Sequence, residues 1–511
     1  MKRVSSTVTG KSGQVTSSAN GETLSETIHQ HKACIEVAAT RMRAAGLPDA
    51  VITNFELLFN SVLCGHTGVI NEHEIEPVSG IDCLDSLSDS EHLDALGRSL
   101  LPKLAVIRLN GGLGTTMGLA RAKSLLAVRG ELTFNDIIAQ QLIALRNSTG
   151  VAVPLLHMTS FSTDGDVRHA MQRYPDLTIE GIAPTFLQHK HPKIYQDDFS
   201  PACEEVEDLN WNPPGHGDIY AALLASGLAE ALVARGKRYL FVANADNLGA
   251  TVDLRILGYL ASKKAPFLME TAERTPADSK GGHLARSKET GALLLRESGQ
   301  CPLTPEGDLI PEFRDISRHR HFNTNNIWLD LEAVIHVART HGGCIPLPLI
   351  SNKKSVNPRD RESRRVIQIE TAMGAAIGVF NGATALQVPR SRFAPVKSNN
   401  DLLVVRSDAY ALTESGHLVR NPKRSVAGLP LVSLDPRYYS LISDFEQRFK
   451  VVPSLVEATS FSVVGDVVFN HGVTIEGSVS IVAEGGEQRA LPEDTVLVVN
   501  SKLLLDESCT R

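Results

Sequence analysis

The 511-residue chain carries 58 acidic and 51 basic side chains, a formal net charge of −7, and 42% hydrophobic residues, which is an ordinary globular composition. The acidic balance argues against a general nucleic-acid binder, although a locally positive pocket for a small anion is compatible with it. Seven scattered cysteines without a Cys-x-x-Cys pair argue against a disulfide framework or a structural zinc site, and they fit a reducing, cytosolic environment.

The N-terminal part of the chain predicts little compact structure of its own. Residues 1–24 are rich in Ser, Thr and Gly, which predicts a disordered tail because they bury too little apolar surface. We expect no secretory signal, since an apolar h-region is missing, whereas a Ser-rich transit peptide stays open. No apolar run approaches the ~20 residues that cross a bilayer. Helical patterns follow at residues 22–45 and 55–64, and acidic, irregular sequence at 71–100 predicts a linker.

A buried sheet is predicted from residue 104 onward. The nearly continuous apolar runs at residues 104–109, 151–156 and 239–242 suit strands that are covered on both faces. Helical patterns alternate with these runs, and the longest extends over residues 218–235. This alternation indicates an α/β sheet.

The C-terminal part has a six-residue apolar period. The repeating positions are Phe461, Val467, Val473 and Val479 and, two residues later in each repeat, Val463, Phe469, Ile475 and Ile481. Such a period favours a β-helix, in which each short strand forms one wall of a coil. Two plain hairpins are the alternative.

A glycine-rich loop follows the first predicted strand. Leu-Asn-Gly-Gly-Leu-Gly-Thr-Thr-Met-Gly at residues 109–118 lets backbone N–H groups approach and cradle an anion. From Gly112 the spacing G-x-G-x-x-x-G is one residue too long for a dinucleotide fingerprint, and no Lys-Ser/Thr follows directly, as a P-loop requires. A structural turn is the alternative.

Two further stretches are candidate ligand contacts. Asn-Pro-Pro-Gly-His-Gly-Asp at residues 212–218 opens a helix whose free N–H groups suit a phosphate or a base carbonyl; an ordinary helix start capped by Asp218 is the alternative. Asp246 lies just beyond a buried strand, at the edge where open α/β sheets bind ligands. A carboxylate there suits magnesium, and an Asx-turn is the alternative.

Polar and basic stretches later in the chain complete the candidates. Phe-Asn-Thr-Asn-Asn-Ile-Trp at residues 322–328 offers amides that suit sugar hydroxyls, with a polar loop as the alternative. The segment 388–397 offers cations for phosphate, although we interpret Arg390 as part of a solvated basic turn. Histidines near residues 73, 189–191 and 319–321 lack the spacing of metal or hydrolase motifs, so we interpret them as structural or solvated.

In this order the motifs resemble the eukaryotic-type UTP–glucose-1-phosphate uridylyltransferases, also called UDP-glucose pyrophosphorylases. The resemblance begins near residue 104, includes the terminal repeat, and rests on residues 109–118, 213–218, 247–253, 280–282, 322–328, 368–372, 388–397 and 401–403. It implies an α/β fold with a GT-A-like (Rossmann-like) mixed central sheet flanked by helices and a C-terminal left-handed β-helix domain. The chain is then divided into a tail (1–24), a helical segment and linker (25–100), a catalytic nucleotidyltransferase domain (101–405) and the β-helix domain (406–511).

The resemblance also implies a reaction: Mg²⁺-dependent, reversible transfer of a uridylyl group from UTP to glucose-1-phosphate, with release of pyrophosphate. Lys123 and Lys397 are the implied catalytic cations, and Asp246 is the implied magnesium ligand. The nucleotide would be lined by Asn110, Gly111 and Gly112, its uracil by Gln188 and Gly215, and the sugar phosphate by His216, Asn325 and Asn326. The implied substrate-binding set also includes Leu109, Asn244 and Asn323.

Two stretches depart from the family pattern. Gly-Leu-Ala-Arg-Ala-Lys at residues 118–123 replaces Gly-Cys-Lys-Gly-Pro-Lys, and residues 160–166 differ from Ser-Phe-Asn-Thr-Asp-Glu-Asp. A broader UDP-sugar pyrophosphorylase is therefore one alternative. A catalytically silent nucleotide-sugar sensor is another, but a sensor would be expected to lose Lys123, Asp246 or Lys397, and all three are present. We expect a cytoplasmic protein with small-molecule substrates and neither nucleic-acid nor membrane partners, and with a homo-oligomer through the C-terminal domain as one option.

Overall fold

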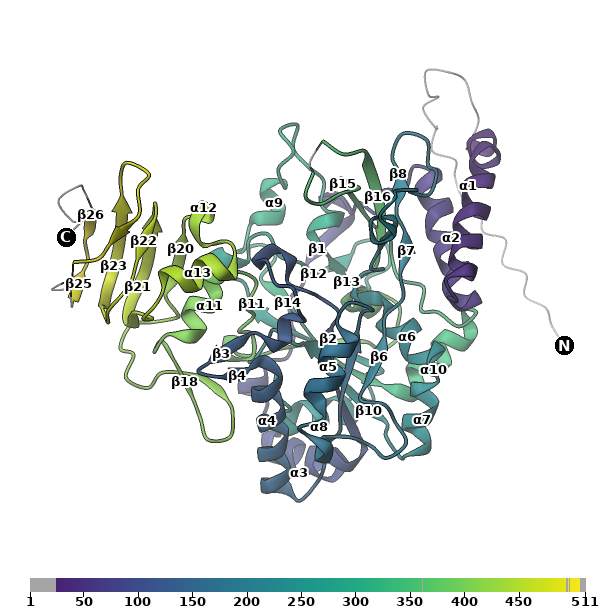
Figure 1. Ribbon diagram of the computed structural model, residues 1–511. Helices are drawn as coiled ribbons and strands as arrows, with labels where there is room; N and C mark the ends of the chain where they lie inside the picture. The colour runs from purple at the N-terminus through teal and green to yellow at the C-terminus, as the bar shows by residue number, and fades with distance from the viewer. Residues whose placement is uncertain (1–23, 361, 493–494, 496, 506–511) are drawn as a thin grey trace. The chain divides into compact units, whose positions relative to one another are not determined.

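The computed structural model describes residues 24–505 apart from 361, 493–494 and 496, so nearly all of the predicted tail lies outside the described residues. By its contacts the chain divides into two compact units, which are described separately here (Figure 1). The first unit comprises residues 24–67, 191–212 and 351–369, and the second comprises the rest. These limits fall at other positions than the predicted domain boundaries, which stay predictions.

The first unit contains two helices, a small sheet in the order β15-β16-β8 and an antiparallel pair, β7-β9. Its elements are α1 (Leu24–Ala44), α2 (Asp49–Leu63), β7 (His191–Pro192), β8 (Ile194–Tyr195), β9 (Trp211–Asn212), β15 (Ile350–Ser355) and β16 (Arg365–Glu370). Both predicted N-terminal helices are present, although α2 begins six residues before the predicted start. Tyr195, Ala202, Val356 and Val366 form a small buried cluster between the strands.

The second unit is built on a mixed sheet of ten described strands (Figure 1). The main path runs β1 (Ile75–Pro77), β12 (His283–Ser287), β14 (His321–Asp330), β10 (Tyr239–Asn244), β2 (Leu104–Asn110), β5 (Leu155–Thr159) and β6 (Thr185–Leu187), with β11 (Phe267–Glu273), β13 (Leu293–Arg296) and β17 (Thr384–Gln387) pairing beside it. Strands β10, β2, β5 and β6 are parallel, whereas β14 is antiparallel to β10. The predicted α/β sheet is thus confirmed, except that the strand expected at 151–156 begins only at Leu155.

The central strands are covered on both faces, as their apolar runs predict. Along β2, Leu104 and Val106 join one buried cluster, whereas Ala105 and Ile107 join another. The covering helices are α3 (Ser90–Leu100), α4 (Phe134–Thr149), α5 (Asp164–Met171), α6 (Ile219–Ala225), α7 (Leu228–Ala234), α8 (Leu254–Ser262), α9 (Pro311–Arg314), α10 (Leu331–Thr340) and α11 (Asn399–Arg406). Two short hairpins, β3 (Ala127–Arg129) with β4 (Leu132–Thr133) and β18 (Tyr410–Leu412) with β19 (Leu418–Arg420), complete this part.

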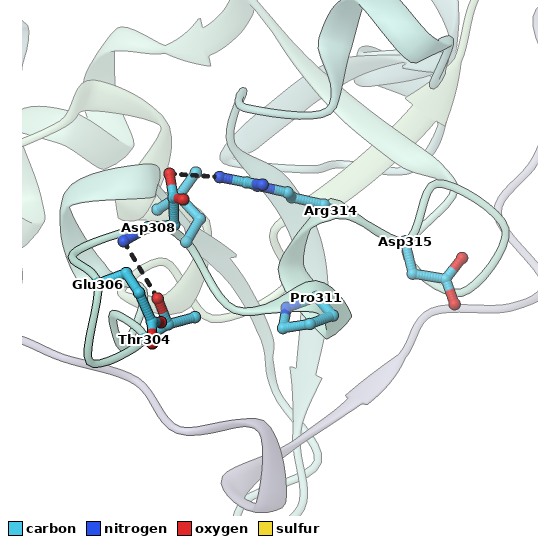
Figure 2. A pocket seen from close by; sticks show the side chains of 7 residues that line it. Thr304, Glu306, Asp308, Pro311, Arg314 and Asp315 are labelled. Carbon is cyan, nitrogen blue, oxygen red and sulfur yellow. Dashed lines mark hydrogen bonds and ion pairs between the residues drawn. The ribbon is translucent and has the colours of Figure 1, made fainter.

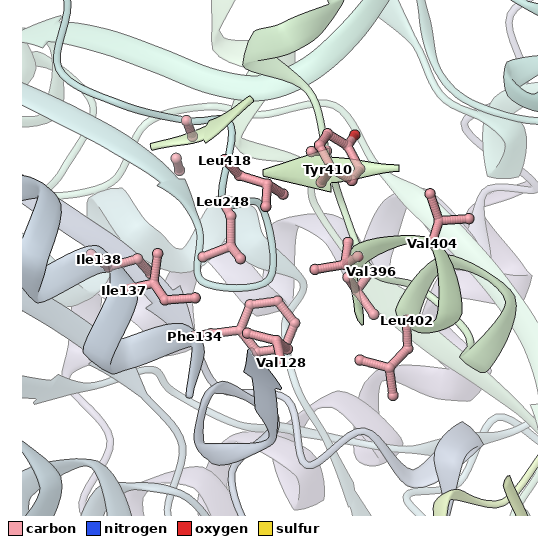
Figure 3. Close-up of a cluster of buried hydrophobic side chains, with 14 of the residues drawn as sticks. Val128, Phe134, Ile137, Ile138, Leu248, Val396, Leu402, Val404, Tyr410 and Leu418 are labelled. Carbon is pink, nitrogen blue, oxygen red and sulfur yellow. The ribbon is translucent and has the colours of Figure 1, made fainter. Parts of the chain in front are cut away.

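One apolar cluster holds the loops that later carry the site. Figure 3 shows Leu248 and Val396 packed with Phe134 of α4 and Leu402 of α11. All four side chains are buried. The chain just after Asp246 and just before Lys397 is therefore fixed by the same core.

Two sequence expectations were wrong. The helix predicted at 218–235 is split into α6 and α7, because Gly227 adopts a left-handed φ of 70° between them. Residues 90–100 are not irregular linker but helix α3. Its Gly97 and Gly258 of α8 allow the two helix backbones to touch, and a Cβ at either glycine would clash with the other helix. The exposed face of α3 is acidic, and these acidic residues obscure in the sequence the apolar spacing that is typical of a helix.

The C-terminal repeat forms stacked parallel strands. Its elements are β20 (Leu431–Leu434), α12 (Pro436–Tyr439), α13 (Ile442–Arg448), β21 (Ser454–Val464), β22 (Val467–Val468), β23 (Thr474–Ala483), β24 (Arg489–Ala490), β25 (Leu497–Val499) and β26 (Lys502–Leu505). Phe461 pairs in parallel with Val479, three repeats later, and Val463 pairs with Ile481. All eight repeat positions are buried. The hairpin alternative is wrong, because hairpins pair antiparallel.

No single described helix is long and apolar enough to cross a membrane. Two consecutive helical segments, His216–Ala225 and Leu228–Ala234, reach the length and apolar composition of a membrane span only when taken together, and they are bent by 64° relative to each other.

Candidate functional site

The predicted ligand edge of the sheet exists. Strands β2, β5 and β10 run parallel, so their carboxyl ends meet at one edge, where open α/β sheets bind ligands. In the register, Leu109 lies opposite Asn244, and Asn110 lies opposite Thr159. The loops that leave this edge are the glycine-rich loop, the segment from Ser160 to α5 and the loop that carries Asp246. The sheet therefore brings two candidate stretches together, along with the segment after β5.

The segment after β5 anchors the glycine-rich loop by hydrogen bonds. Ser160 Oγ donates to the Gly111 carbonyl at 2.9 Å, and Thr163 Oγ1 donates to the Asn110 carbonyl at 2.8 Å. The buried Asn110 amide lies 3.4 Å from Nδ1 of the buried His157. These bonds fix the loop's carbonyls away from the ligand side. Ser160 and Thr163, which make these bonds, match the family pattern, whereas this stretch departs from it at Ser162 and Gly165.

Gln188, the implied uracil contact, lies against this loop. A Cβ at Gly111 would fall 2.7 Å from Gln188 Nε2, so a larger residue at this position would displace the end of the Gln188 side chain. The Gln188 N–H donates to the Thr159 carbonyl at 2.8 Å, which anchors it to the sheet edge. Around Gly112 there is open space, because a Cβ there would meet nothing within 4 Å. One side of the loop is packed and the other is free for a ligand.

Asp246 lies between the two predicted lysines. Lys123 Nζ is 2.9 Å from Asp246 Oδ2, and Lys397 Nζ is 3.3 Å from the same oxygen. The Lys123 N–H also donates to the Gly112 carbonyl at 3.3 Å, and the Val396 N–H donates to the Asp246 carbonyl at 3.1 Å. Gly112, Asp246 and Lys397 therefore belong to one connected group of residues.

Charge and burial differ within this triad. The Asp246 and Lys123 side chains are 13% and 15% exposed, whereas Lys397 is 59% exposed. Burial acts to raise the pKa of Asp246, but the charges of Lys397 and Lys123 outweigh it, so its pKa lies below the usual value. The carboxylate is ionised at neutral pH. The ammonium group of Lys397 is the one that is open to a ligand.

The turn after Asp246 is made by its neighbour. Asn247 Oδ1 accepts the N–H groups of Gly249 at 3.2 Å and Ala394 at 2.8 Å. The Asx-turn proposed as the alternative for this stretch is thus formed by Asn247, and it leaves the Asp246 carboxylate to the lysines. Because Asn247 also bonds the segment before Lys397, it ties the two functional stretches together.

The amide-rich stretch in β14 divides between two environments. Asn325 has a left-handed φ of 57° inside a bulge between β14 and β11, and its Oδ1 accepts from Asn323 Nδ2 at 2.9 Å. Asn326, in contrast, is fully buried, and its Nδ2 donates to Glu270 Oε2 at 3.0 Å. Asn323 and Asn325 stay candidates for sugar contact. Asn326 belongs to an internal network and has no exposed surface to offer a sugar.

That internal network is charged. The Glu270 carboxylate is 0% exposed. It accepts hydrogen bonds from Arg392 Nε at 2.8 Å, from Arg392 Nη2 at 2.6 Å and from Trp328 Nε1 at 2.8 Å. Burial lowers the pKa of Arg392, but Glu270 raises it to a net value above normal. Sequence reasoning missed this network. The available signals were charged residues inside apolar strands, such as Arg108 in β2 and Glu270 in β11, which globular cores admit only when paired.

Glu297 is a second side chain that the motifs did not predict. Its Oε1 lies 3.4 Å from Asn323 Nδ2, and a Cβ at Gly282 would clash with its carboxyl group. Burial raises its pKa, and the Asn323 hydrogen bond offsets part of the rise. The contact with Asn323 places this carboxyl group beside the amides that are candidates for sugar binding.

Gly215 and His216 lie where the chain enters α6. Gly215 has φ 80° and packs against Thr371, and the Gly217 N–H donates to the Thr371 carbonyl at 3.0 Å. His216 Nδ1 accepts the Met373 N–H at 2.9 Å, so its neutral ring carries the proton on Nε2. Burial and the positive charge of Lys397 lower the pKa of His216 to about 4. His216 is therefore a neutral donor within the field of Lys397.

Asp218 occupies the N-cap position of α6, as in the alternative for this stretch, but its side chain makes no capping hydrogen bond. Its carboxylate accepts the His189 N–H at 2.6 Å and lies 2.8 Å from His189 Nδ1. These contacts fix the residue that follows Gln188, and His189 is structural, as interpreted. Arg390 is not free in a basic turn, because its Nη1 pairs with Asp278 at 2.8 Å.

A separate open hollow lies on the loop after β13. Figure 2 shows its lining side chains, with Arg314 paired to Asp308 and Glu306 beside them. Its lining includes none of the predicted site residues. The acidic side chains there are exposed and partly paired, so the hollow plays no part in the candidate site.

A magnesium site could be built here only with help from a ligand. Among the residues that the structure describes, no group of three or more His, Cys, Asp and Glu side chains is placed to hold a metal ion. Asp246 is a single carboxylate. This fits magnesium, which usually takes one or two carboxylates and completes its shell with phosphate oxygens and water.

The fold and the site together define an α/β protein with two lysines and an aspartate clustered at the ligand edge of its sheet. Comparison with known proteins narrows this class. A model of the family described as UTP–glucose-1-phosphate uridylyltransferase matches residues 52–476. The enzyme of that name from Solanum tuberosum is 41% identical over 81% of this chain and 84% of its own. A second, from Dictyostelium discoideum, is 37% identical over 86% and 85%.

Solved structures agree. A mutant UDP-glucose pyrophosphorylase of Leishmania major in complex with UDP-glucose has a TM-score of 0.85 and 40% identity, covering 93% of this chain and 99% of that one. A UDP-glucose phosphorylase of Trypanosoma brucei has a TM-score of 0.84 and 39% identity, covering 93% and 100%. The chain belongs to the UTP–glucose-1-phosphate uridylyltransferase family.

Proposed function

We propose that this protein makes UDP-glucose and pyrophosphate from UTP and glucose-1-phosphate, reversibly and with Mg²⁺. Family membership and the UDP-glucose bound by a solved relative support the choice of substrates. The observation that carries the proposal is the contact of Asp246 with both Lys123 and Lys397 beside the open side of the glycine-rich loop.

The chemistry needs no side-chain nucleophile. An oxygen of the glucose-1-phosphate phosphate attacks the α-phosphorus of UTP in line, the new P–O bond forms, and the bond to pyrophosphate breaks. The protein must bring two polyanions together and neutralise their charge. In this proposal Lys123 and Lys397 do so at the phosphates, Gln188 and Gly215 hold the uracil, and His216 faces the sugar phosphate.

The proposal assigns the other positions by their places in the fold. Leu109, Asn110 and Asn244 lie at the sheet edge and line the nucleotide with Gly111 and Gly112. Asn323 and Asn325 face the sugar, and Asn326 acts from the interior. Asp246 would hold Mg²⁺, which when bound would supply charge neutralisation for the transferring phosphate.

The direct test is pyrophosphate release from UTP, with and without glucose-1-phosphate and Mg²⁺. We expect release only when all three are present. Lys397→Ala should lower kcat by about 10²-fold, the usual effect of removing one transition-state charge stabiliser. Asp246→Ala should remove most activity and flatten the magnesium response. A folded Lys397→Ala enzyme with normal turnover would refute the site. Galactose-1-phosphate and N-acetylglucosamine-1-phosphate in the same assay test sugar selectivity.

Finer features of the family belong to the same proposal. The central sheet would be GT-A-like, and the parallel C-terminal strands would wind as a left-handed β-helix domain over residues 406–511, following a catalytic domain at 101–405. A cytoplasmic location and a homo-oligomer through the C-terminal domain complete it. Cell fractionation of the full chain tests its location. Light scattering tests the oligomeric state by comparing the full chain with a chain that lacks residues 406–511.

A further inference from the structure

A small hollow separates the Lys397 turn from the C-terminal strands. It measures about 190 Å³, and its wall includes Met117, Lys397, Asn399, Tyr439 and Ser440. Because Lys397 borders this hollow and is 59% exposed, side-chain packing does not fix its ammonium group. Its place is therefore set by the ion pair with Asp246, at 3.3 Å, and by the backbone at residues 397–399.

Two sets of bonds hold that backbone. Asp401 Oδ2 accepts the N–H groups of Lys397 and Ser398, each at 2.8 Å, as the capping box of α11. The second anchor is Asn399, which is 3% exposed and whose Nδ2 donates to the Tyr439 carbonyl at 2.7 Å and the Ser440 carbonyl at 2.9 Å. The first anchor is local, whereas the second reaches forty residues along the chain.

Residues 434–441, here called the connecting segment, are in turn bonded to the C-terminal strands. The Tyr439 hydroxyl donates to the Val467 carbonyl at 2.7 Å and accepts the Val467 N–H at 3.2 Å. Asp435 Oδ2 accepts the Gly465 N–H at 2.9 Å. A continuous path of hydrogen bonds thus runs from Val467 through Tyr439 to Asn399.

The connecting segment also touches the nucleotide loop. A Cβ at Gly118 would lie 3.0 Å from the Leu441 side chain. Asn400 Oδ1 accepts the Leu434 N–H at 3.1 Å at the other end of the segment. Both sides of the proposed phosphate site therefore rest on one short segment whose other face belongs to the C-terminal strands.

We propose that Asn399 is a positioning residue for Lys397, and that the connecting segment makes turnover depend on the C-terminal strands. The inference rests on the proposed function of Lys397. Loss of the Asn399 bonds frees the turn that carries the ammonium group. A displacement of about 1 Å at a reacting group costs up to about 10²-fold in rate.

The test is a double-mutant cycle on kcat. Asn399→Leu keeps the branched shape and the number of side-chain heavy atoms but removes both hydrogen bonds; we expect kcat to fall about 10-fold or more with the KM for UTP nearly unchanged. In a Lys397→Ala enzyme the same substitution should change kcat less than about twofold, because the group that it positions is gone. Asn421→Leu, which removes a similar amide bond to the Asp408 carbonyl at 2.8 Å, is the control and should leave kcat unchanged.

The outcomes separate the two proposals. If Lys397→Ala turns over normally, the assigned role of Lys397 fails. If Lys397→Ala is slow but Asn399→Leu is as fast as wild type, or slows both backgrounds by the same factor, only the positioning inference is overturned. Should Asn399→Leu fail to fold, Tyr439→Phe breaks the path one step earlier. It is expected to slow kcat in the wild type and to have no effect beside Lys397→Ala.

Discussion

The buried pair of Glu270 and Arg392 offers the sharpest test of how the site is held. The Glu270 carboxylate has four donors: two from Arg392, one from Trp328 and one from Asn326. Arg392→Met removes two of them. At about 1.5–3 kcal/mol for each hydrogen bond to a buried charge, the loss is about 3–6 kcal/mol, which agrees with the roughly 3–5 kcal/mol typical of breaking a buried ion pair.

The reverse change should cost as much. Glu270→Leu leaves Arg392 buried and without its carboxylate, while the charge of Arg392 already acts to lower the pKa of Arg108. We expect a loss of about 3–5 kcal/mol. The double variant removes both charges and leaves only neutral donors unpaired, so its cost should be about 2–3 kcal/mol, well below the sum.

Trp328 makes the measurement local. It is fully buried and bonded to Glu270, whereas the only other tryptophan, Trp211, lies in the first unit. In a Trp211→Phe background, fluorescence during urea unfolding therefore reports the second unit alone. Single variants within 1 kcal/mol of the parent, or a double variant that equals the sum of the singles, would contradict the charged-network account.

Three further predictions concern the site itself. Asn325→Ala should raise the KM for glucose-1-phosphate, whereas Asn326→Ala should lower the unfolding midpoint and leave that KM nearly unchanged; the opposite pattern would restore Asn326 to the sugar site. Gly112→Ala meets open space, so it should leave the melting temperature unchanged yet raise the KM for UTP about 10-fold if the loop hugs the nucleotide; an unaffected KM would place the nucleotide elsewhere. His157 is 0% exposed, and burial followed by Arg108 lowers its pKa to about 3, so stability present above pH 6.5 should fall on acidification by up to about 1.4 kcal/mol per pH unit toward pH 3. Urea titrations at pH 7 and pH 5 should show a smaller decrease in the free energy of unfolding for His157→Gln than for the wild type. Equal decreases in the two proteins would refute the assignment.

The central sheet could be predicted because its signals are local. The runs at β2 and β10 are apolar at nearly every position, and buried strands need that pattern whatever their neighbours. The two lysines were assigned through the family resemblance, and Asp246 through its place just beyond a buried strand. Their proximity could be predicted, because the carboxyl ends of parallel strands meet at one edge of a sheet.

The assignment of Asn326 could not be predicted from alternation. Asn325 takes a left-handed conformation in a bulge, so the side chains beyond it exchange faces relative to a regular strand. Nothing in the local sequence distinguishes this bulge from a polar loop. The place of Glu297 could not be predicted either, because its only partner among the site amides is Asn323, which is 26 residues away along the chain.

The Lys–Asp–Lys arrangement has an electrical consequence. One carboxylate between two ammonium groups leaves a single surplus positive charge before any substrate arrives. A triphosphate and a sugar phosphate together bring several negative charges to the same edge, far more than that surplus can balance. The side chains can begin the neutralisation but cannot finish it. The remaining countercharge would enter with the substrates, and this is the physical argument for the proposed divalent cation.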